Sequence, residues 1–267
     1  HTHKKTSRLA MIPLQPKHLA LVPVYIYQGL KLKKTALRLP EAQGERSGHI
    51  QLIDNNETKE KKKEILNLML VGDSSAAGVG VSSQHQALAG QLIEQLQLLP
   101  KIQQDFSELN WSLHATSGHT SFDTLRRLYV IAKPQNPVDV MIVMLGVNDT
   151  TTNVSPAKWQ AQLCEIINLS RRKFGAKYIL FPCLPPMQNM PAIPRPLNKL
   201  MGQKTQVMND KLLEVCEQYD DVLAVPIDFR ETGLSATQLF AEDGFHPSAV
   251  TYSFWAAHLA RTISELV

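Results

Sequence analysis

From Ile65 to the end of the chain, short apolar runs alternate with segments whose apolar residues recur at helical spacing. A short apolar run bounded by glycine or polar turn residues is typical of a buried strand. Repeated alternation of such runs with helices predicts a parallel sheet, because each parallel connection needs a crossover. The five predicted strands are Ile65–Val71, Trp111–Ala115, Val138–Leu145, Tyr178–Phe181 and Val222–Ile227.

Helical periodicity occupies the intervals between these strands. One helix has an explicit start, with Ser155 as N-cap and Pro156 at the first helical position, and it stops at Gly175. We therefore predict a parallel sheet covered by helices on both faces, with ligands bound beyond the carboxyl ends of the strands. The predicted helices cover 88–99, 122–132, 156–174, 197–219 and 248–266.

Residues 1–64 differ from the pattern that follows them. Residues 1–40 carry eight Lys or Arg and no Asp or Glu, and residues 54–64 are charge-dense without apolar periodicity. Removing those eight cations from the 28 in the chain leaves 20 against 24 acids, so the net charge of +4 arises in the first 40 residues. We predict a basic, partly apolar extension with a charged linker over 1–64, and one α/β domain over 65–267.

The composition excludes several classes of function. No nucleic-acid partner is expected, because the α/β domain offers no basic stripe or recognised module. Cys164, Cys183 and Cys216 form no C-x-x-C or Cys/His cluster, which argues against a disulfide framework and a structural zinc site. A cytoplasmic or peripherally membrane-associated protein is favoured, while a periplasmic or secreted one stays open.

The most apolar part of the extension is Leu19–Tyr27, which at nine residues is too short to span a bilayer as a helix of about 20. Together with the basic run KLKK at 31–34 it can lie on an anionic membrane surface. Alternatively, it wraps over the following domain. Pro23 is expected to prevent a long continuous helix. The side chains expected to be buried in the second case are Val22, Val24 and Tyr25.

The first predicted strand leads into Gly72-Asp73-Ser74-Ser75-Ala76-Ala77-Gly78. A serine on a tight strand-to-helix turn exposes its hydroxyl beside backbone N–H groups, and small neighbours let a substrate approach. Asp73 directly precedes the serine, so this is not the G-x-S-x-G elbow. Alone, the segment indicates a nucleophile or a phosphate-binding or structural turn about equally.

A second segment, Asp243-Gly244-Phe245-His246-Pro247, precedes the last predicted helix. A serine hydroxyl is a weak nucleophile and needs a base, usually histidine, within hydrogen-bond reach. The other ring nitrogen needs an acceptor that fixes the tautomer, and an Asp three residues earlier can curl back to supply it. Taken alone, this D-x-x-H segment also fits an ordinary helix cap.

Two more segments offer hydrogen-bond donors at predicted strand ends. Gly146-Val147-Asn148-Asp149 follows the third strand, and Ser117-Gly118-His119 follows the second. The side-chain amide of Asn148 and the backbone N–H of Gly118 can both donate to an oxyanion, and losing one such donor typically costs about 2.7–4 kcal/mol of barrier. Each segment alone also fits a simple turn.

These four segments, in this order, resemble the sequence blocks of the GDSL, or SGNH, hydrolase family. Gly72–Gly78 is similar to the first block and Gly118 to the glycine of the second. Gly146–Asp149 matches the third block, G-x-N-D, and Asp243–Pro247 matches the last, D-x-x-H-P. The resemblance covers roughly 65–267, and departs where Ser75-Ala76 stands in place of a leucine that many members carry.

The resemblance implies a flavodoxin-like, three-layer α/β/α sandwich with a five-stranded parallel sheet, and a serine-dependent carboxylic ester hydrolase without metal or cofactor. Ser74 is then the nucleophile, His246 the general base and later acid, and Asp243 the residue that orients His246. The backbone N–H groups of Ser74 and Gly118 and the amide of Asn148 form the oxyanion hole.

A proline-rich loop follows the fourth predicted strand, with the sequence PCLPPMQNMPAIPRP over 182–196. It lies on the ligand side of the sheet, so we predict an apolar pocket there for short- to medium-chain acyl or lipid-like esters. A stiff surface connection is the alternative. An acyltransferase, a carbohydrate acetylesterase and a non-catalytic membrane- or partner-binding module also stay open. The predicted pocket residues are Leu184, Met187, Met190 and Ile193.

Overall fold

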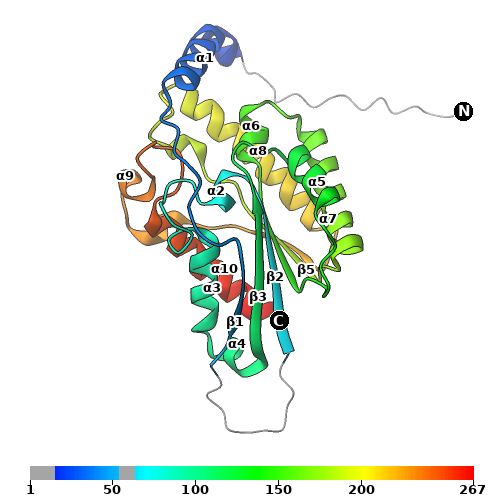
Figure 1. Cartoon of the computed structure of the whole chain (residues 1–267). Coiled ribbons are helices and arrows are strands. Elements are labelled where there is room, and N and C mark those ends of the chain that lie inside the picture. The colour runs from blue at the N-terminus through cyan, green and yellow to red at the C-terminus, as the bar shows by residue number, and fades with distance from the viewer. Residues whose placement is uncertain (1–15, 54–63) are drawn as a thin grey trace, which may run out of the picture.

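Six strands form a single sheet in the computed structural model, which describes residues 16–53 and 64–267, and their order is β1-β3-β2-β4-β5-β6 (Figure 1). The central strands are almost wholly buried because their side chains are apolar on both faces. The strands are β1 (Ser47–Gln51), β2 (Glu64–Gly72), β3 (Phe106–Ala115), β4 (Val140–Met144), β5 (Tyr178–Pro182) and β6 (Val222–Val225).

The prediction of five parallel strands is confirmed for β2 to β6, which pair in parallel throughout. The sheet also contains a sixth strand, because β1 pairs antiparallel with β3. This strand lies in the stretch that the sequence analysis assigned to the extension. Its sequence, SGHIQ, contains one strongly apolar residue and is never fully buried, so it carried no strand signal.

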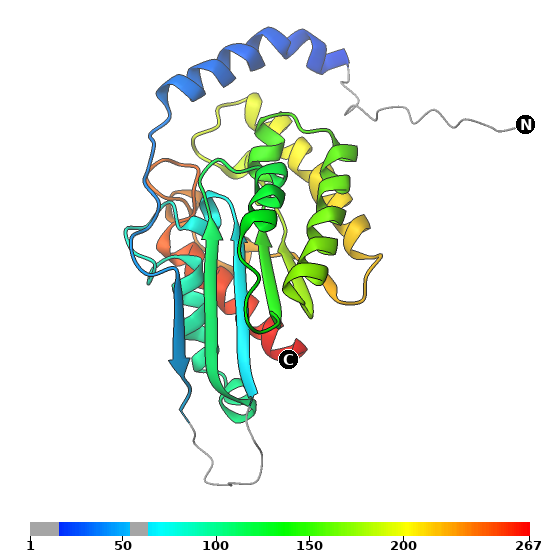
Figure 2. The same cartoon turned by 45° about the vertical axis from the view of Figure 1, so that its right-hand side comes forward.

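Helices cover the sheet on both faces (Figures 1 and 2). Helices α3 and α10 pack on one face with the even-numbered apolar residues of β2, and α5, α7 and α8 pack on the other with Met69 and Val71. The helices are α1 (Pro16–Thr35), α2 (Ser74–Ala77), α3 (Leu88–Gln97), α4 (Pro100–Asp105), α5 (Ser121–Val130), α6 (Val147–Thr151), α7 (Pro156–Phe174), α8 (Leu197–Cys216), α9 (Ala236–Leu239) and α10 (Ala249–Leu266).

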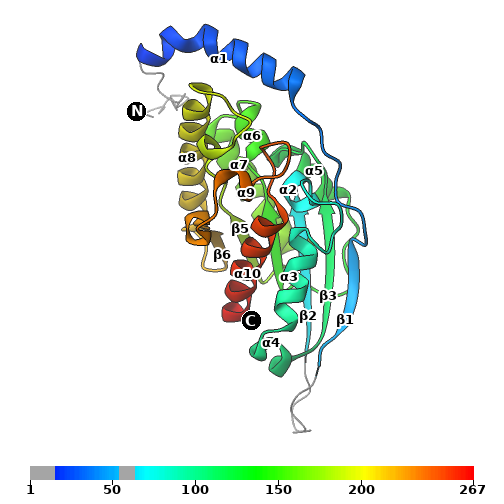
Figure 3. The same ribbon diagram turned by 90° about the vertical axis from the view of Figure 1, so that its left-hand side faces the viewer.

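Helix α1 is continuous from Pro16 to Thr35 with Pro23 inside it, so the expectation that Pro23 prevents such a helix is wrong. A proline inside a helix removes one backbone hydrogen bond and crowds one carbonyl, but here helical turns continue on both sides of Pro23. The helix lies across the end of the molecule at which the parallel strands terminate (Figure 3). Most of the predicted linker, residues 54–63, lies outside the described residues.

The described part of the chain has no helix long and apolar enough to cross a membrane. Nor does it contain a group of three or more His, Cys, Asp or Glu side chains arranged to hold a metal ion. Cys164, Cys183 and Cys216 are all free thiols.

Candidate active site

Ser74 begins helix α2 directly after strand β2, on a turn that requires glycine at its start. Gly72 has φ 154°, and a Cβ there would lie 2.2 Å from the carbonyl oxygen of Met144 on β4. Asp73 donates its backbone N–H to the same carbonyl at 3.2 Å, and its carboxylate accepts from the N–H of Ser75 at 3.0 Å. The tight β2–α2 turn therefore joins two neighbouring strands and presents Ser74 at their carboxyl ends.

Asp243 and His246 come from a compact turn before α10. One carboxylate oxygen of Asp243 accepts from the backbone N–H groups of Phe245 and His246, both at 2.9 Å. Gly244 has φ 65°, a left-handed conformation that glycine adopts readily. The turn thus folds the Asp243 carboxylate back beneath the ring of His246, as the three-residue spacing predicts.

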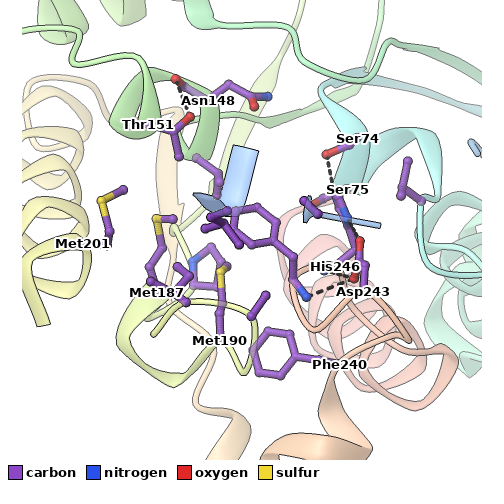
Figure 4. Close-up of a pocket in the computed structure, with 18 of the residues that line it drawn as sticks. Ser74, Ser75, Asn148, Thr151, Met187, Met190, Met201, Phe240, Asp243 and His246 are labelled. Atoms are coloured by element: carbon purple, nitrogen blue, oxygen red, sulfur yellow. Dashed lines mark hydrogen bonds and ion pairs between the residues drawn. The ribbon is translucent and has the colours of Figure 1, made fainter. Parts of the chain in front are cut away.

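The three side chains form one hydrogen-bonded chain (Figure 4). His246 Nε2 lies 2.9 Å from Ser74 Oγ, and His246 Nδ1 lies 2.5 Å from the second carboxylate oxygen of Asp243. The Asp243 side chain is only 4% exposed, whereas His246 is 21% exposed, so the carboxylate is shielded and the ring faces the cavity. The structure therefore brings together the three residues that the sequence predicts as a catalytic unit.

The two carboxyl groups beside Ser74 have opposite pKa shifts. Burial disfavours the charge of Asp243, but hydrogen bonds from the His246 ring and from two backbone N–H groups outweigh it and lower its pKa. Asp73 is fully buried, and this burial raises its pKa to about 7 although Ser75 donates to it. Asp243 is thus held ionised beside His246, while the carboxyl of Asp73 has a pKa of about 7.

Gly118 and Asn148, the predicted oxyanion donors, both border the cavity that contains Ser74. Gly118 has φ 83° and open space on its Cβ side, so its backbone is accessible to a ligand. The side chain of Asn148 extends toward Ser74 (Figure 4) and donates one amide hydrogen to the carbonyl of His119 at 3.0 Å. The amide carries two hydrogens, so the second remains for a ligand.

A buried carboxylate fixes these two donors relative to each other. Asp149 follows Asn148 and accepts from both the backbone N–H and the hydroxyl of Ser121, the latter at 2.6 Å. Ser121 begins α5 just after the Gly118 loop, with Thr120 as its N-cap. Burial is the largest influence on Asp149 and raises its pKa despite these bonds.

Residues that the sequence analysis missed support the Gly118 loop from the other side. Glu41 accepts the backbone N–H of Ser117 at 2.9 Å, and Arg46 forms an ion pair with Glu41. Arg46 also donates to the carbonyl of Ala115 at 2.7 Å, at the end of β3. Neither residue belongs to a recognisable motif, and the contact depends on the pairing of β1 with β3, so no sequence signal indicated it.

A cavity of about 850 Å³ extends from Ser74 and His246 toward helix α1. Three of the four predicted pocket residues, Met187, Met190 and Ile193, line it and are buried. Leu184 does not line the cavity: it packs in the core, where its side chain lies 2.6 Å from the position of a Cβ on Gly146. Lining residues that the sequence analysis missed include Tyr25, Leu197, Met201 and Phe240.

The fold and the site define a carboxylic ester hydrolase of the three-layer α/β/α type. Residues 70–254, more than half of the chain, match the model of the GDSL-like Lipase/Acylhydrolase family, and the chain belongs to that family. The resemblance noted in the four sequence blocks is thereby confirmed. A comparison with curated protein sequences finds no match.

Solved structures share the fold at low identity. A lipase/acylhydrolase from Enterococcus faecalis superposes with a TM-score of 0.57 at 18% identity, covering 75% of this chain and 96% of that one. A member of the lipolytic protein G-D-S-L family from Veillonella parvula DSM 2008 has a TM-score of 0.58 at 13% identity, covering 73% of this chain and 97% of that one. An acetylxylan esterase from Geobacillus stearothermophilus has a TM-score of 0.54 at 19% identity, covering 75% of this chain and 95% of that one. At these identities the similarity establishes the fold.

Proposed function

We propose that this protein hydrolyses carboxylic esters of apolar acyl groups through a covalent acyl-Ser74 intermediate. The observation that carries the proposal is the continuous chain from Ser74 Oγ to His246 Nε2 and from His246 Nδ1 to Asp243. A hydroxyl, an imidazole and a buried carboxylate in this sequence are the parts that serine acyl transfer needs.

In the first step, Ser74 Oγ attacks the carbonyl carbon of the ester while His246 Nε2 accepts the hydroxyl proton. The negative charge of Asp243 stabilises the imidazolium that forms and holds Nδ1 protonated. His246 then gives the proton to the departing alkoxide, the alcohol leaves, and the acyl group stays on Ser74.

In the second step, His246 takes a proton from water, and the resulting nucleophile attacks the acyl-Ser74 carbonyl. The carboxylic acid leaves as the proton returns to Ser74. In both tetrahedral intermediates the oxyanion accepts from the N–H groups of Ser74 and Gly118 and from the Asn148 amide, whose contributions are electrostatic and preorganised.

The apolar cavity supports an acyl group larger than acetate. Its volume lies toward the upper end of the roughly 300–1,000 Å³ that small-molecule sites occupy. Methionines at 187, 190 and 201 border it, and thioether side chains adapt to flexible apolar ligands. We infer that medium-chain acyl groups bind here better than the acetate of a carbohydrate ester.

Initial rates on p-nitrophenyl esters from acetate to palmitate, with acetylated xylan as a separate substrate, test the proposal. We expect activity that rises with chain length beyond acetate and disappears in Ser74→Ala. Persistent activity in Ser74→Ala would reject the serine mechanism. A preference for acetylated xylan would reject the apolar acyl specificity, and faster product release with added methanol would instead indicate acyl transfer to alcohols.

A further inference from the structure

Helix α1 packs on the protein through only one of its faces. Tyr25 is buried against the cluster of Met187, Met190 and Met201, with Leu21 and Leu32 partly buried on the same side. The Gln28 side chain accepts the backbone N–H of Leu197 at 3.1 Å and donates to the carbonyl of Arg195 at 2.6 Å, which binds α1 to the start of α8.

Large apolar side chains on the remaining surface of α1 and its continuation are left uncovered. Five large apolar side chains there are between 49% and 65% exposed. Single exposed apolar residues are common, but a group on one element marks a contact surface. Figure 3 shows α1 as the outermost element at its end of the described structure. The five residues are Leu19, Ile26, Tyr27, Leu30 and Leu37.

Cations are interspersed with these apolar residues. Residues 16–40 carry no Asp or Glu, and the five cations among them form no ion pair within the described chain. An apolar surface with unpaired cations is complementary to an anionic, amphiphilic one. The cations are Lys17, Lys31, Lys33, Lys34 and Arg38.

This surface is continuous with the candidate active site. Ile26, Lys33 and Leu37 border the same cavity as Ser74 and His246. An acyl chain leaving a surface bound to α1 would therefore enter the cavity along its apolar wall without crossing bulk water.

We propose that the outer face of α1 docks on an anionic lipid bilayer and that the enzyme takes its ester from that bilayer. The apolar side chains enter the boundary between headgroups and acyl chains, while the lysines remain at the level of the phosphates. The choice of a membrane-dissolved substrate rests on the proposed ester hydrolysis, whereas the docking itself does not.

The test is cosedimentation of the full chain with phosphatidylcholine vesicles that contain either no phosphatidylserine or about 30% of it. We expect pelleting with the anionic vesicles that falls at about 0.5 M salt, since salt screens the lysines. Tyr27→Ser with Leu30→Ser, and separately Lys31→Glu with Lys34→Glu, should each weaken binding at least about 5-fold. None of these four residues borders the cavity.

A matched control is Tyr129→Ser with Val130→Ser on α5, which removes two exposed apolar side chains from another face and should leave binding unchanged. Hydrolysis of soluble p-nitrophenyl butyrate should stay the same in all variants, so a failure of docking is distinct from a failure of catalysis. Equal pelleting of the wild type and the α1 variants, or none by the wild type, overturns the proposal. So does a dimer in light scattering that only Tyr27→Ser with Leu30→Ser dissociates, since a second copy would then cover this face.

Discussion

The cavity has two ends that are held together by different forces. At the catalytic end, Ser74, His246 and Asp243 are fixed by directional hydrogen bonds and flanked by buried carboxyl groups. At the far end, α1 rests on methionines and leucines, and Gln28 makes two hydrogen bonds to the segment that begins α8. Directional hydrogen bonds thus fix the first end, whereas apolar packing makes up most of the contact at the second.

This difference corresponds to the two tasks of an esterase. Bond rearrangement needs donors and acceptors placed to within fractions of an ångström, because small misplacements cost large factors in rate. Holding an acyl chain needs apolar area of roughly the right shape. Changes at the catalytic end should therefore slow all esters alike, and changes at α1 should discriminate between chain lengths.

Among the substitutions that compare the two ends of the cavity, Asn148→Ala has the largest expected effect. Losing one oxyanion donor should lower kcat about 10²–10³-fold with little change in KM, equally for acetate and decanoate esters. Steady-state kinetics on both esters measures this. Asn136→Ala, an exposed asparagine elsewhere, serves as the control. A loss smaller than about threefold would show that the oxyanion is stabilised by other groups.

Stability should depend on pH through Asp73. Its pKa is raised in the folded state, so the native protein binds a proton more tightly than the unfolded chain, and the free energy of unfolding should fall as pH rises from about 4 to about 7. By pH 8 the free energy of unfolding should have fallen by on the order of 4 kcal/mol, which corresponds to a pKa difference of roughly three units. Urea unfolding of wild type and Asp73→Asn from pH 5 to pH 8 should show a shallower slope in the variant.

The pKa shift of Asp243 has the opposite sign to that of Asp73 and affects stability in a different pH range, so the two contributions can be measured separately. Its lowered pKa stabilises the fold above the ordinary carboxyl range, and that stability is lost only as pH falls below about 4. Parallel pH slopes for the wild type and Asp73→Asn between pH 5 and pH 8 would contradict the assignment to Asp73.

Glu41→Ala should lower kcat by about 10-fold for all chain lengths, because Ser117 loses its acceptor and the Gly118 donor shifts. Glu41→Gln keeps an acceptor and should restore most of the rate. The measurement is kcat and KM on acetate and decanoate esters. A similar loss in both variants would show that the ion pair with Arg46, and not the hydrogen bond to Ser117, is what the rate depends on.

The smallest effect is expected at α1. Tyr25→Ala should reduce kcat/KM for decanoate about 5-fold, equivalent to about 1 kcal/mol, and leave acetate within twofold. Competition between the two esters in one reaction gives this ratio directly. An equal loss of kcat/KM for the decanoate and acetate esters would show that the α1 end of the cavity does not discriminate between chain lengths.

The sequence indicates well which residues lie together at the Ser74 end of the cavity, because their signals are local. The apolar runs of β2 and β4 mark strands buried on both faces, and the Asp243–His246 spacing encodes its own turn. The sequence did not indicate β1, whose edge position needs no apolar pattern. It also did not show that the side chain of Leu184 packs against Gly146 in the core instead of lining the cavity.

The far end depends on contacts between distant segments. Gln28 is hydrogen-bonded to Leu197, which lies 169 positions away in the sequence, and no local pattern in either segment predicts that contact. The helix-breaking tendency of proline is likewise a local rule, and it does not predict that α1 runs continuously through Pro23 while Tyr25 packs on the methionine cluster.

Strand β1 also protects the edge of the sheet from pairing with a second copy of the chain. It occupies the outer edge of the ten-residue β3, pairing from Ser47 opposite Ser112 to Gln51 opposite Glu108, and itself leaves only a short, polar edge. Long unpaired edges are templates for intermolecular strand addition. A fragment trimmed to begin at Glu64 would expose the edge of β3, so its expected fate is aggregation even though it retains Ser74, Asp243 and His246.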